Sequence, residues 1–308
     1  MENQNSLANS TIFASSEALK LRWISVQCYE MVLPNGKVIV TDPFYWEGEN
    51  IADPKALSEE DQKFYQVYKQ TGFSVDDFTG ADYILITHIH GDHVNIVGKL
   101  WEKFHGRILV SAGAAEELAR IFNIPFGALY PLYPGNTYYF DDFTLNTYPA
   151  AHDSRQFRLG NFMRPDDPED GKKGSDIFGM PYPNKSWGYG YLYCMNFMIT
   201  TLQNYRIDIS SGMDFEEHAR HMMDVHPNLM LRHRIRSYSP EVYAQQMERM
   251  GAQLMMPLHH NNARASGEDL DAYFAAVNEV LKSHHYPGCA FNPVPYKWYS
   301  IQTAILEA

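Results

Sequence analysis

Short apolar runs alternate with polar, turn-forming stretches along most of the chain, which is the pattern of a mixed α/β protein. The apolar runs 23–33 and 37–41 flank Pro34-Asn35-Gly36, a sequence typical of a β-hairpin turn. Further β-rich runs predict strands, and segments with apolar residues every three or four positions predict helices. Strands are expected at 83–87, 107–112, 137–140, 144–150, 189–201, 205–211, 228–232 and 253–258, and helices at 58–69, 94–104, 114–122, 214–224, 241–250 and 267–282.

Both halves of the chain contain hairpins followed by alternating strands and helices. We therefore expect two similar β-rich halves with helices packed outside them, within one domain over residues 17–308. Residues 1–16 are polar and rich in Ser and Asn, which predicts a flexible N-terminal arm. Residues 155–187 are rich in Gly, Pro, Asp and Lys and lack periodicity, which indicates an inserted loop that is a lid or is disordered.

The segment Thr-His-Ile-His-Gly-Asp-His at 87–93 directly follows an apolar strand and holds four side chains that can bind metal. Side chains alternate along an extended segment, so His88 and His90 should point to the same side. Gly91 lets the chain turn sharply without a steric penalty, so that Asp92 and His93 can face a second position. Imidazole and carboxylate ligands together suit Zn²⁺, Mn²⁺ or Fe²⁺ better than Ca²⁺ or Mg²⁺.

The pattern His88-x-His90-x-Asp92-His93 after a hydrophobic strand resembles the HxHxDH signature of the metallo-β-lactamase superfamily. The resemblance extends from about residue 23 to about residue 262, and its other segments occur in the family's order. Within the superfamily they are most similar to the L-ascorbate 6-phosphate lactonase-like branch. These segments are Thr41-Asp42-Pro43, Pro149-Ala150-Ala151-His152-Asp153-Ser154, Ser211-Gly212-Met213-Asp214 and Met256-Pro257-Leu258-His259.

The resemblance implies a four-layer αββα sandwich, in which two mixed sheets pack face to face with helices outside and metals at one edge. It also implies two divalent metal ions, Zn²⁺ first and Mn²⁺ or Fe²⁺ as alternatives, with a metal-bridging hydroxide as the nucleophile. Asp42 would orient a ligand imidazole, and Asp92 and Asp214 would be catalytic residues. The implied metal ligands are His88, His90 and His152 for one ion and Asp92, His93 and His259 for the other, with Asp214 bridging both.

Two members of this ligand set have alternatives in the sequence. Asp214 stands in Ser-Gly-Met-Asp, whereas the family more often has Gly directly before the Asp, so Asp208 is an alternative bridge. His259 is followed by His260, and a one-residue shift of register would exchange the two side chains.

Candidates for contact with a substrate anion are Arg155, Arg158, His260 and Arg264. Four carboxylates lie among the basic residues of 155–173, so an ordinary solvated loop explains Arg155 and Arg158 equally well. The aromatic residues of the loop, which include Trp187, fit either the wall of a pocket or an anchor for the loop, and the sequence leaves both interpretations open.

Residues and resemblance together indicate a metal-dependent hydrolase of a small ester, lactone or related acyl substrate, phosphorylated substrates included. A phosphodiesterase is the alternative enzyme, although Asn95 stands where phosphodiesterase branches commonly carry a second Asp. A non-catalytic metal-binding scaffold is the alternative of another class, although degenerate members usually lose ligands and seven candidates are present here.

Composition and charge indicate which binding partners and which cellular compartment to expect. Lys and Arg number 25 against 37 Asp and Glu, and the net charge of -12 disfavours nucleic acid and anionic membranes. No apolar run approaches the length of a membrane span, the N-terminus carries no export signal, and the three cysteines are far apart. We therefore expect a cytoplasmic protein with a small-molecule substrate, and the number of subunits stays open, a homo-oligomer included.

Overall fold

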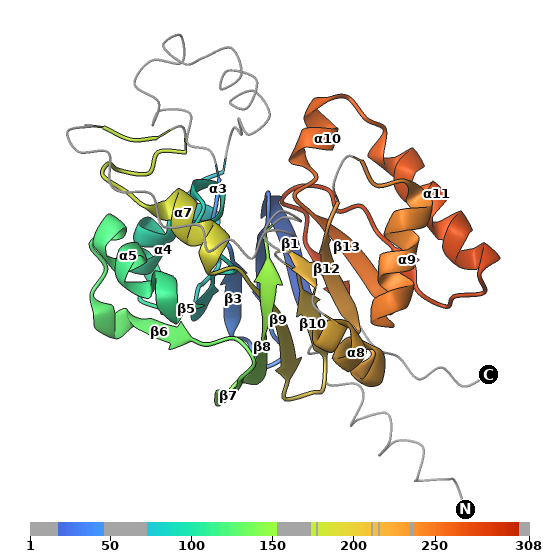
Figure 1. Ribbon diagram of the computed structural model, residues 1–308, viewed down its shortest axis with the longest axis horizontal. Coiled ribbons are helices and arrows are strands. Elements are labelled where there is room, and N and C mark those ends of the chain that lie inside the picture. The colour runs from blue at the N-terminus through green and yellow to red at the C-terminus, as the bar shows by residue number, and fades with distance from the viewer. Residues whose placement is uncertain are drawn as a thin grey trace, which may run out of the picture.

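The computed structural model describes residues 18–45, 73–152 and 174–301, except for residues 177, 211, 215, 235 and 236. Within these ranges, two β-sheets pack face to face and helices cover both outer faces (Figure 1). Both sheets are mixed, so the predicted four-layer αββα sandwich is confirmed.

The first sheet is antiparallel in its N-terminal half and parallel beyond β3. The predicted hairpin is present between β2 and β3, where the Gly36 amide donates to the Leu33 carbonyl at 2.8 Å. The apolar run 23–33 is divided between two strands, because the chain turns at Val26, whose φ is 46°. In spatial order the strands are β15 (Tyr299–Ile301), β1 (Leu19–Ser25), β2 (Cys28–Val32), β3 (Val38–Thr41), β4 (Tyr83–Leu85), β5 (Arg107–Ser111) and β6 (Leu129–Leu132).

The second sheet has the same two-part design, with antiparallel pairing from β11 to β10 and parallel pairing beyond. The similar halves expected from the sequence are therefore visible as two sheets that each combine hairpins with parallel strands. In spatial order the strands are β11 (Met213–Asp214), β8 (Phe143–Ala151), β9 (Met195–Thr201), β10 (Arg206–Ile209), β12 (Leu229–His233), β13 (Leu254–Leu258) and β14 (Cys289–Ala290), with β7 (Thr137–Tyr139) paired to β8.

The helices divide between the two outer faces. In Figure 1, α4 and α5 lie beside the first sheet, and α8, α9 and α11 lie beside the second. Helix α9 is capped at both ends, since the Ser239 hydroxyl accepts from the Val242 amide and Gly251 ends the helix with φ 67°. The helices are α3 (Gly91–Val94), α4 (Val97–Phe104), α5 (Ala112–Phe122), α7 (Ser186–Leu192), α8 (Glu216–Val225), α9 (Pro240–Met250), α10 (Asn261–Ala265) and α11 (Leu270–Ser283), with 3₁₀ turns η2 (Val75–Asp77) and η3 (Phe126–Ala128).

Three apolar clusters separate the four layers. One fills the space between the sheets, and the other two lie under the outer helices of each sheet. Neighbouring residues of a central strand enter different clusters, as Ile84 and Leu85 of β4 show. Such a strand is buried on both faces, which explains why it reads as an unbroken apolar run and why it holds the following motif firmly.

Two predicted elements are wrong in part. Residues 189–201 were expected as one strand, but 189–192 belong to α7 and only Met195–Thr201 form β9. Residues 214–224 were expected as a helix, but Asp214 is the last residue of β11 and α8 begins at Glu216. The predicted helix 58–69, the arm 1–16 and most of the loop 155–187 lie outside the described residues. None of the helices in the described ranges combines the length and apolar character needed to cross a membrane.

Candidate metal centre

The HxHxDH segment follows the carboxyl end of β4 and continues into the first turn of α3. His90 is the residue before α3 and has an extended backbone, with φ -62° and ψ 151°. At Gly91 the chain turns from the extended backbone of His90 into α3, and it does so without a positive φ. A Cβ at Gly91 would lie 2.7 Å from Cβ of Phe178, so the glycine also allows close packing.

Two compact groups of metal-competent side chains form at this edge of the sandwich. His88, His90 and His152 make one group, and Asp92, His93 and His259 make the other. Within each group, the candidate ligand atoms all lie within 4.8 Å of one another. The groups adjoin, because the ring centroids of His88 and His93 are 3.9 Å apart.

In the second group, the ligand atoms of all three side chains lie within 3.7 Å of one another. Nε2 of His259 lies 3.3 Å from Nε2 of His93 and 3.4 Å from Oδ2 of Asp92. Nε2 of His93 lies 3.7 Å from Oδ1 of Asp92. Two segments that are far apart in sequence are thus brought together by the ends of β4 and β13.

Hydrogen bonds outside the groups select which nitrogen of each ring faces inward. The Thr87 hydroxyl donates to Asp42 at 2.6 Å, so its lone pairs accept from Nδ1 of His88 at 3.1 Å. Nε2 of His88 is then left buried with no hydrogen-bond partner in the described ranges. Nε2 of His90 donates to the Trp187 carbonyl at 2.9 Å, which leaves Nδ1 as the available lone pair.

Asp42 contacts the second group, as the sequence predicted for a residue that orients a ligand. Its fully buried carboxylate accepts from Nδ1 of His93 at 3.1 Å and from the Thr87 amide at 2.7 Å. Nε2 of His93 therefore carries the lone pair that faces Asp92 and His259. Burial is the main cause that raises the pKa of the Asp42 carboxyl, and the nearby Asp92 carboxylate adds to it.

The charge states of the groups suit a cation. Burial, reinforced by the neighbouring histidines, lowers the pKa of His88 and His93 well below the ordinary value, and it lowers that of His90 to about 3. Burial also lowers the pKa of His259 to about 4 and raises that of Asp92 to about 7. The imidazoles are therefore neutral near pH 7 and present lone pairs, and a cation would favour the charged form of Asp92. The donor set and the unpartnered Nε2 of His88 both fit a divalent metal ion.

The structure separates His259 from its neighbour His260. His259 follows β13 with a positive φ of 54°, and its amide donates to the Val26 carbonyl at 3.0 Å. His260 turns away and is fully buried, with its ring 4.0 Å from that of Trp23. His259 is thus the residue that joins a metal-competent group, and the buried ring of His260 is not placed as a substrate contact.

Asp208, the alternative bridge, lies on the face of the second sheet that the outer helices cover. Its carboxylate bonds to Nε2 of His218 at 2.8 Å, and both side chains are fully buried. Its cross-strand partner Met198 packs in the apolar cluster under the outer helices. Asp208 belongs to neither group of metal-competent side chains among the described residues. For Asp214, the structure describes the backbone, which pairs with Ala150 two residues before His152, and not the side chain.

Arg264 is one of the predicted substrate contacts that the structure describes. Arg264 places its guanidinium 5.3 Å from the ring of Trp23 and donates to the Pro293 carbonyl at 3.1 Å. Both contacts are structural, and neither Trp23 nor Pro293 belongs to a metal-competent group. Arg155 and Arg158 lie outside the described residues.

Helix α7 brings aromatic residues against the first group. The Trp187 ring stacks on His90 with centroids 4.6 Å apart and planes 21° from parallel. The Tyr191 ring lies 4.8 Å from His90 and 4.5 Å from His152. Sequence analysis missed Tyr191, although its spacing of four residues from Trp187 is a helical signal that two intervening glycines obscure.

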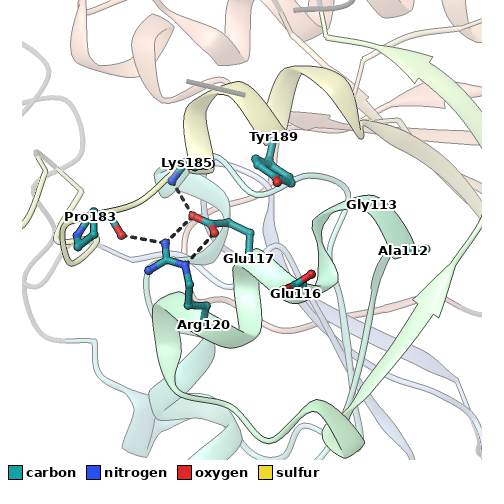
Figure 2. A pocket seen from close by; sticks show the side chains of 8 residues that line it. All are labelled: Ala112, Gly113, Glu116, Glu117, Arg120, Pro183, Lys185 and Tyr189. Carbon is teal, nitrogen blue, oxygen red and sulfur yellow. Dashed lines mark hydrogen bonds and ion pairs between the residues drawn. The ribbon is translucent and has the colours of Figure 1, made fainter. Parts of the chain in front are cut away.

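A buried carboxylate on α5 anchors the start of α7. Oε1 of Glu117 accepts from the Lys185 amide at 2.6 Å, and both oxygens accept from Arg120 at 2.7 and 2.9 Å (Figure 2). A cavity of about 450 Å³ lies beside this anchor, and none of the six clustered metal-competent residues lines it. Glu117 is another residue that the sequence did not mark, because a Glu in a helix ordinarily faces solvent.

We expect Glu117→Gln to loosen α7. The amide nitrogen of Gln would face either the guanidinium N–H groups or the Lys185 amide, so one donor loses its acceptor. Arg120 is half exposed, so the cost in unfolding free energy is about 1–2 kcal/mol. Urea unfolding measures the cost, and hydrogen exchange of residues 186–192 should become faster. Glu116→Gln, an exposed neighbour at the same cavity, is the control, and equal effects of the two variants would contradict the anchoring role.

No model of a known protein family matches the chain, and no curated protein matches it significantly in sequence. Its fold, by contrast, is found in solved structures. Igni18, a novel metallo hydrolase from the hyperthermophilic archaeon Ignicoccus hospitalis, is 14% identical with a TM-score of 0.59, covering 93% of this chain and 100% of that one. An isothiocyanate hydrolase from Delia radicum gut bacteria is 14% identical with a TM-score of 0.59, covering 92% and 99%.

The metallo-β-lactamase fold protein YhfI from Bacillus subtilis is 10% identical, with a TM-score of 0.53 and coverage of 92% of this chain and 100% of that one. Likeness at such low identity establishes the architecture and leaves the chemistry to the site. The chain therefore has the metallo-β-lactamase fold, in agreement with its two mixed sheets and outer helices.

Proposed function

We propose that this protein is a metal-dependent hydrolase whose centre binds two divalent metal ions. The observation that carries the proposal is the adjacency of two three-residue groups at one edge of the sandwich, with inward nitrogens set by outer hydrogen bonds. One ion would be held by His88, His90 and His152, and the other by Asp92, His93 and His259. Their imidazole and carboxylate atoms favour Zn²⁺, with Mn²⁺ and Fe²⁺ as alternatives.

Two bound metal ions would lower the pKa of water towards neutrality and polarise a substrate oxygen. The protein's own contribution is to keep its imidazoles neutral and correctly turned, which it does by burial and through Asp42, Thr87 and the Trp187 carbonyl. Asp92 is the one carboxylate among the six clustered residues, and we propose it as the group that accepts and returns a proton. We keep Asp214 as the proposed bridge, on the basis of its backbone position beside Ala150.

The proposed substrates are small esters, lactones or related acyl compounds, phosphorylated ones included. The likeness to an isothiocyanate hydrolase supports attack at an electrophilic carbon, because isothiocyanates and acyl compounds share that feature. Asn95 is an amide, so it adds no carboxylate to the centre, and its amide nitrogen donates to the Tyr45 carbonyl at 2.9 Å. The lack of a carboxylate at this position favours the acyl hydrolase over the phosphodiesterase.

The proposal is tested by metal analysis and a substrate panel on the same purified protein. We expect about two metal ions per chain and turnover of at least one aryl ester, lactone or isothiocyanate, faster than that of bis-p-nitrophenyl phosphate. A faster reaction with the phosphodiester would favour the phosphodiesterase over the acyl hydrolase. If the protein binds no metal and turns over none of these compounds, the result would favour a non-catalytic scaffold over a hydrolase.

We expect Asp42→Asn to weaken metal binding by about 10- to 100-fold. The Asp42 carboxylate accepts three hydrogen bonds, and an amide would turn a donor towards Thr87 or His93. Competition with a chromophoric chelator measures the affinity. Asp82→Asn is the control, because Asp82 pairs with Lys37 in an exposed contact. Asp82 directly precedes β4, at the opposite end of the strand from the metal-competent groups. Equal affinities of the two variants would contradict the role of Asp42.

A further inference from the structure

We propose that the indole of Trp187 is a binding wall for a flat, apolar part of the substrate, next to the first histidine group. This inference rests on the proposed function, because it assigns the substrate class of the same centre. It also predicts ligand binding that can be measured without turnover.

Trp187 is far more exposed than its neighbours on α7. It is 52% exposed, whereas its helix neighbours Ser186, Gly188 and Tyr191 are buried. One face of its indole lies against His90, and Tyr191 meets it edge to face at 5.3 Å. The exposed part of the indole therefore faces away from His90. An exposed aromatic ring that borders a catalytic centre is typical of a ligand site, because a ligand recovers the free energy of removing it from water.

The opposite side of the centre is polar. Nε2 of His233 bonds to Oε1 of Gln27 at 3.0 Å, and the His233 ring lies 5.3 Å from that of His259. The side chain of His259 is 27% exposed, and its Nε2 lies 3.4 Å from Oδ2 of Asp92. A substrate that spans the two metal groups would thus meet an apolar wall at His90 and polar groups at His259. This asymmetry would orient a molecule that has one apolar end and one polar end.

The wall is held in a fixed position, which favours binding because little freedom is lost. A Cβ at Gly190 would lie 2.2 Å from Cδ2 of His90, so α7 packs directly on the ligand ring. A Cβ at Gly113 of α5 would lie 2.3 Å from the Tyr193 ring, so the far end of α7 is packed as closely. The Glu117 bond to Lys185 holds the start of the helix.

The experiment compares 4-phenylbutanoate with acetate, two carboxylates of the kind that ester hydrolysis releases. Calorimetry on the metal-loaded wild type is expected to show at least about tenfold tighter binding of 4-phenylbutanoate. Trp187→Ala should remove most of that preference, and Trp187→Phe should keep most of it. The His90 hydrogen bond goes to the backbone carbonyl of Trp187, so both variants should retain their metal. Tyr139→Ala is the control, since Tyr139 is an 82% exposed ring on β7, which pairs with the other end of β8 from His152.

Equal binding of the two acids by the wild type would overturn the proposal, as would a preference that survives in metal-loaded Trp187→Ala. The difference in fluorescence between wild type and Trp187→Phe isolates the emission of Trp187. 4-Phenylbutanoate should change this emission and acetate should not, and an unchanged signal at saturation would also overturn the proposal. If binding behaves as expected but no ester, lactone or isothiocyanate is hydrolysed, the wall stands and the proposed hydrolase fails.

Discussion

His259→Asn is expected to lower kcat/KM by about a thousandfold and to reduce the metal content from about two ions per chain to about one. Loss of the second ion removes several kcal/mol of transition-state stabilisation, and each 1.36 kcal/mol is about tenfold in rate. Asn is the most suitable replacement, because His259 has a positive φ of 54°, a conformation that Asn tolerates well. The fold should therefore survive while the imidazole is lost.

His226→Asn provides the matched control for this experiment. His226 is an exposed histidine with a φ of 51°, so the same substitution is made in the same backbone conformation away from both metal-competent groups. We expect this variant to keep its metal and its activity. If His259→Asn retained two metal ions and a rate within tenfold of the wild type, His259 would not be a ligand.

Metal removal is expected to make the stability of the protein strongly dependent on pH between about 7 and 5. His88, His90, His93 and His259 have folded-state pKa values below the ordinary 6.5, so the unfolded chain binds more protons than the folded one in this window. Their contribution to stability is present above pH 6.5 and is lost as the pH falls. Each histidine would cost about 2 kcal/mol between pH 6.5 and 5.

Two carboxyls act in the opposite direction. Asp42 and Asp92 have raised pKa values, with Asp92 at about 7, so the folded chain binds more protons at these groups and gains stability as the pH falls. At the centre, these four histidines against two carboxyls leave a net loss of about 4 kcal/mol, which is a large part of a typical stability. Outside it, His260 with its lowered pKa adds to the loss, and Asp176 with a pKa raised to about 6 opposes it. Bound metal at 100 times its Kd adds about 2.7 kcal/mol until acid releases it.

Thermal unfolding from pH 7.5 to 5, with metal and with a chelator, measures both effects. We expect the chelated protein to lose Tm steadily below pH 7, and the metal-loaded protein to keep its Tm to a lower pH before it drops. A chelated protein whose Tm is flat or rises towards pH 5 would show that the histidines are not buried as neutral groups. Chelated His259→Asn should show a shallower pH dependence, because one of the four histidines is gone.

Much of the centre could be predicted because its chemistry is concentrated at the ends of buried strands. The apolar run of β4 leads directly to His88, and that of β13 leads to His259. Such runs are read easily from a sequence, because a strand buried on both faces leaves few polar positions. The choice between His259 and His260 could not be made, since it depends on the left-handed backbone at His259, and sequence periodicity does not predict a single residue of that kind.

The parts that were not predicted depend on packing between distant segments. The sequence predicts strand for residues 189–192 of α7, because its tyrosines favour strands and its two glycines oppose a helix. Gly190 instead allows α7 to pack closely against His90. Asp208 could serve as a bridge by composition alone, and only its burial against His218 places it elsewhere. Contacts of this kind arise from tertiary structure and leave no periodic signal.

The most direct test is a crystal structure of the metal-loaded protein with anomalous scattering recorded at the metal edge. We expect two peaks, one bonded to His88, His90 and His152 and one bonded to Asp92, His93 and His259. A single peak outside these residues, or metal bound at 88–93 with His152 and His259 remote from it, would contradict the proposed centre.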